Sequence, residues 1–207
     1  MTKTKVLYCF VAFTLSIPMF GASASWVPYS AQYKETDTLN YSNGKQTKTV
    51  KIIKEIRSSD GSFAKFEMIN DGPVTGEIWM SCGQAASLNY ETKQASLTKR
   101  DARQHMYIPP DPPLGAITIA GLQATGYPIH MPPGSTGTIW MAMDSEILVK
   151  LEYHRASNGF HEDYVKQLES VYMNAVDPDA STKLPSGFSI SPGSAIAGTC
   201  SSTTSHQ

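Results

Sequence analysis

The sequence predicts a mainly β protein, built as a curved antiparallel meander sheet that forms an incomplete barrel, with at most one or two helices. The first observation behind this prediction is alternation: residues 147–154 carry apolar side chains at odd positions and polar ones at most even positions. Such a period of two is typical of a strand with one buried and one solvated face. The second observation is a run of turn signals, of which Asn43-Gly44, Asp60-Gly61 and Asn158-Gly159 are the clearest. Asn-Gly is the strongest short hairpin signal because both residues tolerate positive φ.

The first half of the chain is expected to form a series of hairpins. The dense turn chemistry of Asn70-Asp71-Gly72-Pro73 predicts a turn, and Glu91-Thr92-Lys93 lies at the centre of another. Between these turns the β-branched and aromatic residues favour strands. The expected strands cover residues 29–39, 47–57, 63–69, 77–82, 85–90 and 95–99.

The second half resumes the same pattern, with strands expected over 116–119, 122–129, 138–143 and 147–154. Pro132-Pro133-Gly134 marks a turn, and the following residues 135–137 are assigned to it. Residues 161–176 fit two structures, since their apolar positions suit one face of a helix and also one face of a strand. The hairpin signal before them favours the strand.

One domain is expected over residues 25–190, with a stiff exposed loop at 100–114. Pro109, Pro110, Pro112 and Pro113 exclude helix or central strand from that loop because proline has no amide donor. Residues 191–207 are rich in Ser, Thr and Gly and are expected to form a flexible tail.

Residues 1–24 have the three parts of a cleavable secretory signal. Lys3 and Lys5 form the positive region, residues 6–20 are apolar, and Ala22-Ser23-Ala24 supplies the small residues of a cleavage site. The apolar stretch is shorter than the roughly 20 residues that cross a bilayer. We therefore expect an exported protein, periplasmic or secreted, whose mature chain has no membrane-spanning segment.

Composition argues against one class of partner and does not decide whether the cysteines pair. The formal net charge is −1 and the sequence has no basic cluster, which argues against nucleic acid as a partner. Cys82 and Cys200 are the cysteines that remain after cleavage. In an oxidising compartment they suggest a disulfide, and two free thiols are the equal alternative.

The chain shows no motif for catalysis, a metal or a cofactor. The histidines lack the spacing of a zinc site, and His154 and His161 on either side of a hairpin turn are interpreted as a solvated hairpin end. Gly-x-Ser-x-Gly and glycine-rich phosphate loops are absent from the sequence. We expect a protein that is not an enzyme and takes no cofactor.

The order of several short motifs resembles a group of uncharacterised exported bacterial proteins. The motifs are residues 119–126, 132–134, 139–140, 147–153, 177–179 and 184–188. In layout the whole meander is also distantly similar to the periplasmic lipoprotein-carrier (LolA-like) superfamily. That resemblance implies a curved, incompletely closed sheet around a hydrophobic cavity, without assigning a binding residue.

Large apolar side chains supply the remaining hypothesis about function. A sheet core uses the same residue types as a cavity that encloses an apolar ligand. The first hypothesis is a carrier or binder of a lipid or other apolar ligand, and the alternative is an envelope-associated protein–protein interaction module with a packed core. The candidate cavity residues are Trp79, Met80, Trp140, Met141, Met143 and Tyr153.

Overall fold

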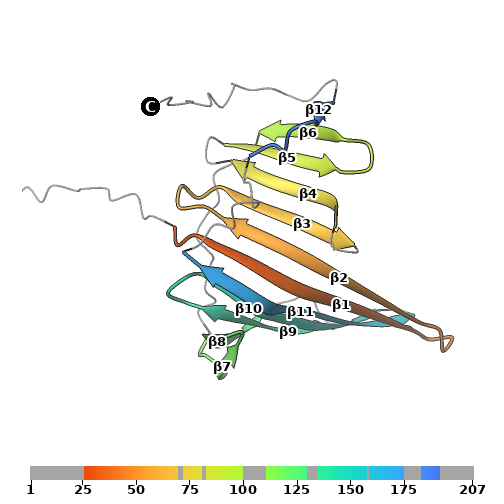
Figure 1. The fold of residues 1–207 in the computed structure, drawn as a ribbon. Helices are drawn as coiled ribbons and strands as arrows, with labels where there is room; N and C mark the ends of the chain where they lie inside the picture. The colour runs from red at the N-terminus through yellow and green to blue at the C-terminus, as the bar shows by residue number, and fades with distance from the viewer. Residues whose placement is uncertain are drawn as a thin grey trace, which may run out of the picture.

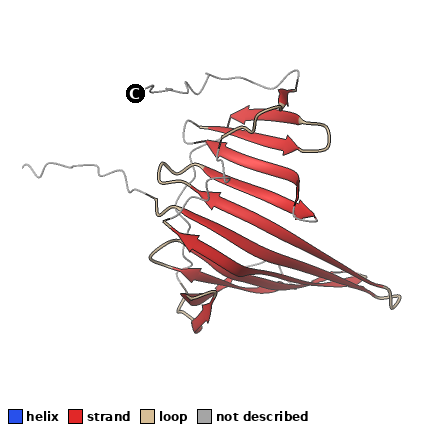
Figure 2. Ribbon diagram, viewed as in Figure 1, coloured by secondary structure: helices blue, strands red, loops and turns tan. Residues whose placement is uncertain are grey.

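The computed structural model describes residues 26–69, 72–80, 83–99, 111–129, 135–157, 159–174 and 183–191. In this part of the chain all regular structure is strand, arranged as one open sheet (Figures 1 and 2). The expected mainly β, curved meander is confirmed. The strands are β1 (Tyr29–Tyr41), β2 (Gln46–Arg57), β3 (Phe63–Ile69), β4 (Gly72–Met80), β5 (Gln84–Asn89), β6 (Gln94–Lys99), β7 (Gly115–Ile119), β8 (Leu122–Ile129), β9 (Ser135–Ala142), β10 (Ile147–Ser157), β11 (Phe160–Met173) and β12 (Ser189–Ile190).

The first strand lies in the middle of the sheet and joins its two halves. The order is β12-β6-β5-β4-β3-β2-β1-β11-β10-β9-β8-β7, so each half is a meander of sequential neighbours apart from β12, which lies beside β6. β1 pairs with β11 along all of its 13 residues. The last described strand, β12, is the exception to the antiparallel pattern and pairs parallel to β6.

Three segments test the sequence-based assignments most closely. Residues 160–173 form strand β11, as the hairpin signal favoured. β4 begins at Gly72 and includes Pro73, whereas the sequence predicts a turn at these residues. Pro73 sits beside a register shift between Glu67 and Met68, where the ladder is already irregular and a missing donor is tolerated.

β9 likewise begins earlier than expected, at Ser135, and includes Gly137. A Cβ on Gly137 would lie 3.1 Å from the carbonyl oxygen of Glu152 and 3.1 Å from the Cβ of Tyr153. Glycine therefore serves here for close approach of two strands rather than for a turn.

Two hydrophobic clusters lie on opposite faces of the sheet. Tyr29 pairs with Arg57, and its neighbour Ser30 pairs with Ile56. Because directly paired residues share a face and adjacent residues do not, Tyr29 and Ile56 point to opposite sides. One face of the sheet is therefore buried around the central strand β1, and the opposite face is buried across β2–β6.

We call these groups the β1 cluster and the β4 cluster. The buried members of the β1 cluster are Tyr29, Ala31, Tyr33, Ile53, Ala124, Ala142, Ile147, Val149 and Leu168, with Ile117, Ile119 and Leu122 of the β7–β8 hairpin packed against them. The buried members of the β4 cluster are Ile56, Ala64, Phe66, Ile78, Ala86, Leu88 and Ala95, with Met68, Met80, Tyr90, Leu97, Leu184 and Phe188 packed against them.

Some expectations concern residues outside those described. They are the leader over 1–24, Cys82, Cys200, most of the proline-rich loop, and the tail beyond Ser191. Among the residues that are described, no helix of a length and hydropathy suited to crossing a bilayer occurs.

Candidate functional site

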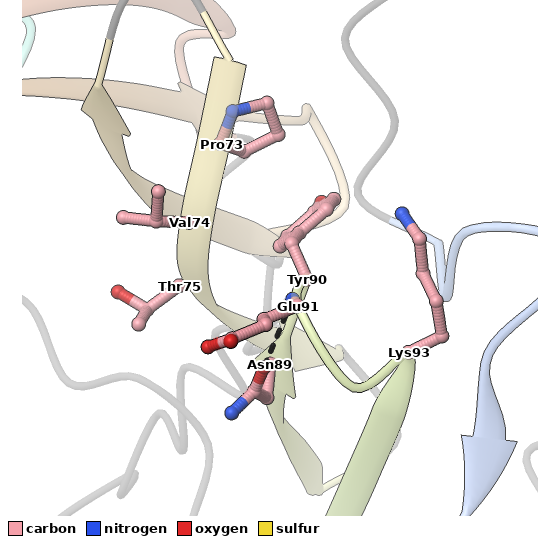
Figure 3. A pocket seen from close by; sticks show the side chains of 7 residues that line it. All are labelled: Pro73, Val74, Thr75, Asn89, Tyr90, Glu91 and Lys93. Carbon is pink, nitrogen blue, oxygen red and sulfur yellow. Dashed lines mark hydrogen bonds between the residues drawn. The ribbon is translucent and has the colours of Figure 1, made fainter.

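A hollow of about 700 Å³ lies between the start of β4 and the turn that joins β5 to β6 (Figure 3). β4 contributes one wall, and the end of β5 with the following turn contributes the other. Its lining residues are Pro73, Val74, Thr75, Asn89, Tyr90, Glu91 and Lys93.

The β5–β6 turn has a local cause in Asn89. Its Oδ1 accepts the backbone N–H of Glu91 at 3.0 Å and that of Thr92 at 3.0 Å, and Figure 3 shows the first of these bonds. This is the turn-forming behaviour of asparagine. Lys93 completes the turn at a φ of 55°. The N–H of Tyr90 donates to the carbonyl of Val74 at 3.2 Å, so the tyrosine backbone is tied directly to β4.

Tyr90 is the centre of an aromatic row at the inner side of the hollow. Its ring meets Phe66 edge-on at 6.3 Å between centroids and Phe188 edge-on at 5.0 Å. Edge-to-face geometry at these distances is favourable for aromatic pairs. Gly76 makes room for the row, because a Cβ there would lie 2.8 Å from Cδ1 of Phe66. Through Tyr90 the hollow adjoins the β4 cluster.

The rim of the hollow carries one base and one acid. The Nζ of Lys93 lies 5.2 Å from the centroid of Tyr90 and 5.5 Å from that of Phe188, which is cation–π range. Glu91 is exposed on the other side of the turn. Burial raises the pKa of the Tyr90 hydroxyl, so it stays protonated near neutral pH and can donate a hydrogen bond. The site combines an apolar wall with polar groups at its mouth.

A second candidate site is a set of polar and aromatic side chains that connects β10 and β11, on the face that carries the β1 cluster. The hydroxyl of Tyr153 donates to Oε1 of Glu162 at 2.8 Å, and the rings of Tyr153 and Tyr164 stack with centroids 4.8 Å apart. Arg155 Nη2 lies 2.5 Å from the other oxygen of Glu162. Because Glu162 is buried, this pairing compensates a charge removed from water.

The pKa values of Tyr153, Tyr164 and the neighbouring Asp37 are all raised. Burial, the hydrogen bond to Glu162 and nearby carboxylates raise the pKa of Tyr153 to about 12. Burial, together with Glu35, raises the pKa of Tyr164 further. Burial and the charge of Glu162 raise the pKa of Asp37, against a smaller lowering by Arg155. The two phenols are neutral at physiological pH and act as packing and hydrogen-bonding groups.

The histidines of the β10–β11 hairpin do not face each other across the ladder. His154 pairs with Asp163 and places Nδ1 2.6 Å from its carboxylate, while His161 pairs with Ala156. Within the described segments no group of three or more His, Cys, Asp or Glu side chains is placed to hold a metal ion.

The six candidate cavity residues divide among separate places. Trp79 contacts Phe63 at 5.7 Å between ring centroids, while its neighbour Met80 packs on the β4 cluster. Trp140 packs on the β1 cluster, and Met141 is buried beside it in β9. Met143 lies in the turn after β9, and Tyr153 belongs to the tyrosine–glutamate group described above.

The hollow contains none of those six residues, and its own members lacked a strong sequence signal. Turn chemistry identified residues 91–93 as a turn, which is correct. The approach of Phe188 to Tyr90 joins residues 98 positions apart, and no local pattern indicates it.

Comparisons with known proteins give a distant similarity of fold. No family model matches the chain, and no curated protein matches it. An uncharacterised conserved protein from Thermus thermophilus is 6% identical with a TM-score of 0.48, over 78% of this chain and 90% of that one. The Pseudomonas aeruginosa MucA/MucB complex matches at 12% identity and 0.47, over 78% of this chain and 56% of that one.

A LolA superfamily protein from Nitrosomonas europaea is also similar, at 7% identity and a TM-score of 0.32, over 71% of this chain and 87% of that one.

Proposed function

We propose that this chain is an exported, non-enzymatic binding protein that holds a ligand with an apolar body and a polar end, such as an acyl chain, in the hollow beside Tyr90. The observation that carries the proposal is the continuity between the hollow and the β4 cluster. Tyr90 belongs to both, so a ligand seated against its ring extends an existing apolar surface.

The size and lining of the hollow suit such a ligand. Its volume of about 700 Å³ falls within the range of roughly 300–1,000 Å³ that is typical of small-molecule sites. Each buried methylene contributes about 0.8 kcal/mol, so the apolar body would supply most of the affinity. Lys93 is exposed, and an ion pair with it adds only about 0–1 kcal/mol. Its role would be orientation of an anionic end group.

Native mass spectrometry of the full chain, purified gently from an exporting host, is the first test. We expect a bound apolar molecule that organic extraction releases and identifies. Titration of the unchanged chain and of variants with a fluorescent dodecanoic acid analogue then tests whether the ligand binds in the hollow. Val74→Asp places a charge in the hollow and should weaken binding at least tenfold.

Val50→Asp is the matched control, because Val50 is 50% exposed on β2, outside the hollow, and the substitution is the same. This variant should bind as the unchanged chain does. Equal binding by the Val74 variant, in a folded protein, would exclude the hollow as the site.

One observation favours the alternative function of a protein–protein interaction module. The edge of the sheet at β6 already accepts an additional strand, β12, in parallel. Strand addition at a sheet edge is a common mode of peptide recognition.

A further inference from the structure

We propose that the edge of β6 and the adjoining rim of the β4 cluster form a docking groove for an extended peptide of another protein. In the structure residues 183–191 of the chain itself occupy this groove, and we call them the clasp. The proposal concerns the sheet edge and does not depend on a ligand in the hollow.

Backbone pairing is the first element of the groove. Ser189 pairs with Gln94 and Ile190 with Ala95. The N–H of Ser189 donates to the carbonyl of Lys93 at 2.9 Å, and the N–H of Ser191 donates to that of Ala95 at 2.8 Å. The first acceptor lies at the end of the β5–β6 turn and the second in β6. These bonds require no particular side chain, so any extended segment can make them.

Side-chain anchoring is the second element and supplies selectivity. Leu184 and Phe188 both pack against the β4 cluster. Phe188 in addition meets Tyr90 edge-on, and the ammonium of Lys93 lies 5.5 Å from its ring centroid. Gly187, at a φ of 83°, turns the chain between the two apolar anchors, and the paired strand follows Phe188 directly. The occupant is therefore defined by chemistry: a leucine and an aromatic residue four positions apart, followed by a short extended segment.

The clasp is held by few interactions compared with the rest of the sheet. β12 has two residues, both exposed, and Ile190 is 45% exposed. β5, by contrast, pairs along all six of its residues with both β4 and β6. Local segments with few buried apolar contacts and exposed backbone bonds open at low free energy. A segment of similar chemistry in another protein can then take the place of the clasp.

The partner must compete with a segment of the same chain. A competitor within the same chain acts at a high effective concentration, which is not diluted as a free peptide is. A free peptide consequently binds the unchanged chain weakly, and weakening the clasp should reveal the intrinsic affinity of the groove.

A labelled peptide with the sequence of residues 183–191 tests the groove by fluorescence anisotropy. The receptor is the full chain carrying Leu184→Ser and Phe188→Ser, which removes both anchors of its own clasp. We expect at least tenfold tighter peptide binding than by the unchanged chain. The same peptide carrying Phe188→Ala should lose at least tenfold in affinity.

Val50→Ser with Tyr172→Ser is the matched control receptor, because both side chains are large, apolar and exposed elsewhere on the sheet. It should bind the peptide no better than the unchanged chain. Equal binding by the clasp variant and this control would overturn the proposal.

Hydrogen exchange on the unchanged chain provides a second measurement that needs no folded variant. The amides of Ser189 and Ser191 should exchange faster than that of Ala86 in β5, and faster still with excess peptide. Exchange of all three at one common rate would also overturn the proposal. A chain that binds the peptide but not the fatty-acid probe would refute only the function proposed for the hollow.

Discussion

The ammonium of Lys166 lies 2.5 Å from Oε1 of Glu55, although the two residues are 111 positions apart. Lys166 is on β11 and Glu55 on β2, with the central strand β1 between them. Both side chains are 8% exposed, and Oε1 of Glu35 on β1 lies 3.9 Å from the same ammonium. The ion pair therefore crosses β1 and connects the two meander halves on one face.

Replacing Lys166 with methionine should destabilise the fold by about 3–5 kcal/mol, since the substitution leaves a buried carboxylate without its partner. Urea unfolding followed by circular dichroism measures this change. The control is Lys51→Met: Lys51 pairs with Glu67 at 3.2 Å, but with 42% and 26% of the side chains exposed. Such a pair is worth about 0–1 kcal/mol. Equal effects of the two substitutions would contradict the role given to Lys166.

Arg57 should not tolerate lysine. It is 1% exposed, donates from Nε to the carbonyl of Val27 at 2.9 Å and from Nη2 to that of Ser145, and its guanidinium lies 4.6 Å from the ring centroid of Tyr29. Lysine has neither the planar fork nor the stacking surface. We expect Arg57→Lys to cost about 2–3 kcal/mol, on the scale of charged hydrogen bonds. A urea midpoint equal to that of the unchanged chain would refute this.

Gly126 should not tolerate a side chain. A Cβ there would lie 2.6 Å from Cζ3 of Trp140, within a cluster that is already packed. Gly126→Ala should lower the free energy of unfolding by about 1–3 kcal/mol, the usual cost of overpacking. Gly72→Ala is the control, since its Cβ would meet only the carbonyl of Ile69 at 3.7 Å. Thermal unfolding of the two variants compares them directly.

Alkaline pH should destabilise the protein through its half-buried tyrosines. Tyr153 has a pKa of about 12 in the folded state, whereas the unfolded value is about 10. Above pH ~10 the unfolded chain has lost a proton that the folded chain keeps, so stability falls as pH rises toward about 12. Urea midpoints and tyrosinate absorbance follow this loss. Tyr153→Phe should flatten the decline between these pH values, and an unchanged slope would contradict the assignment.

Asp37→Asn should stabilise the protein at neutral pH but not in acid. Burial and the charge of Glu162 raise the pKa of Asp37, so its ionised form is disfavoured in the folded state. Below the unfolded pKa the carboxyl is protonated in both states and the substitution has little to relieve. Comparing urea midpoints of the two chains at pH 3 and pH 7 tests the sign. A gain in acid alone would contradict it.

The sequence by itself was sufficient for most of the strands and turns, although it did not indicate β12 and placed the starts of β4 and β9 too late. Asn43-Gly44 and Asp60-Gly61 mark hairpins because glycine at these places adopts positive φ, with values of 81° and 83°. The alternation after Ile147 correctly predicts that Ile147 and Val149 are buried while His154 is exposed. These are properties of a few neighbouring residues, so local patterns report them.

Other features required the tertiary structure. Alternation shows that a strand has a buried face, but not that the β1 and β4 clusters use opposite faces of one sheet. That outcome depends on register across several strands. Composition likewise could not separate Trp79 from Met80, which pack in different places.

Only the fold, therefore, brings Phe188 to Tyr90 and Lys166 to Glu55. Strand propensity and turn chemistry act over a few residues, whereas these contacts depend on the order and register of strands that are distant in the chain. Local patterns in a single sequence therefore reveal strands and turns, whereas contacts between distant residues become visible only when the whole sheet has packed.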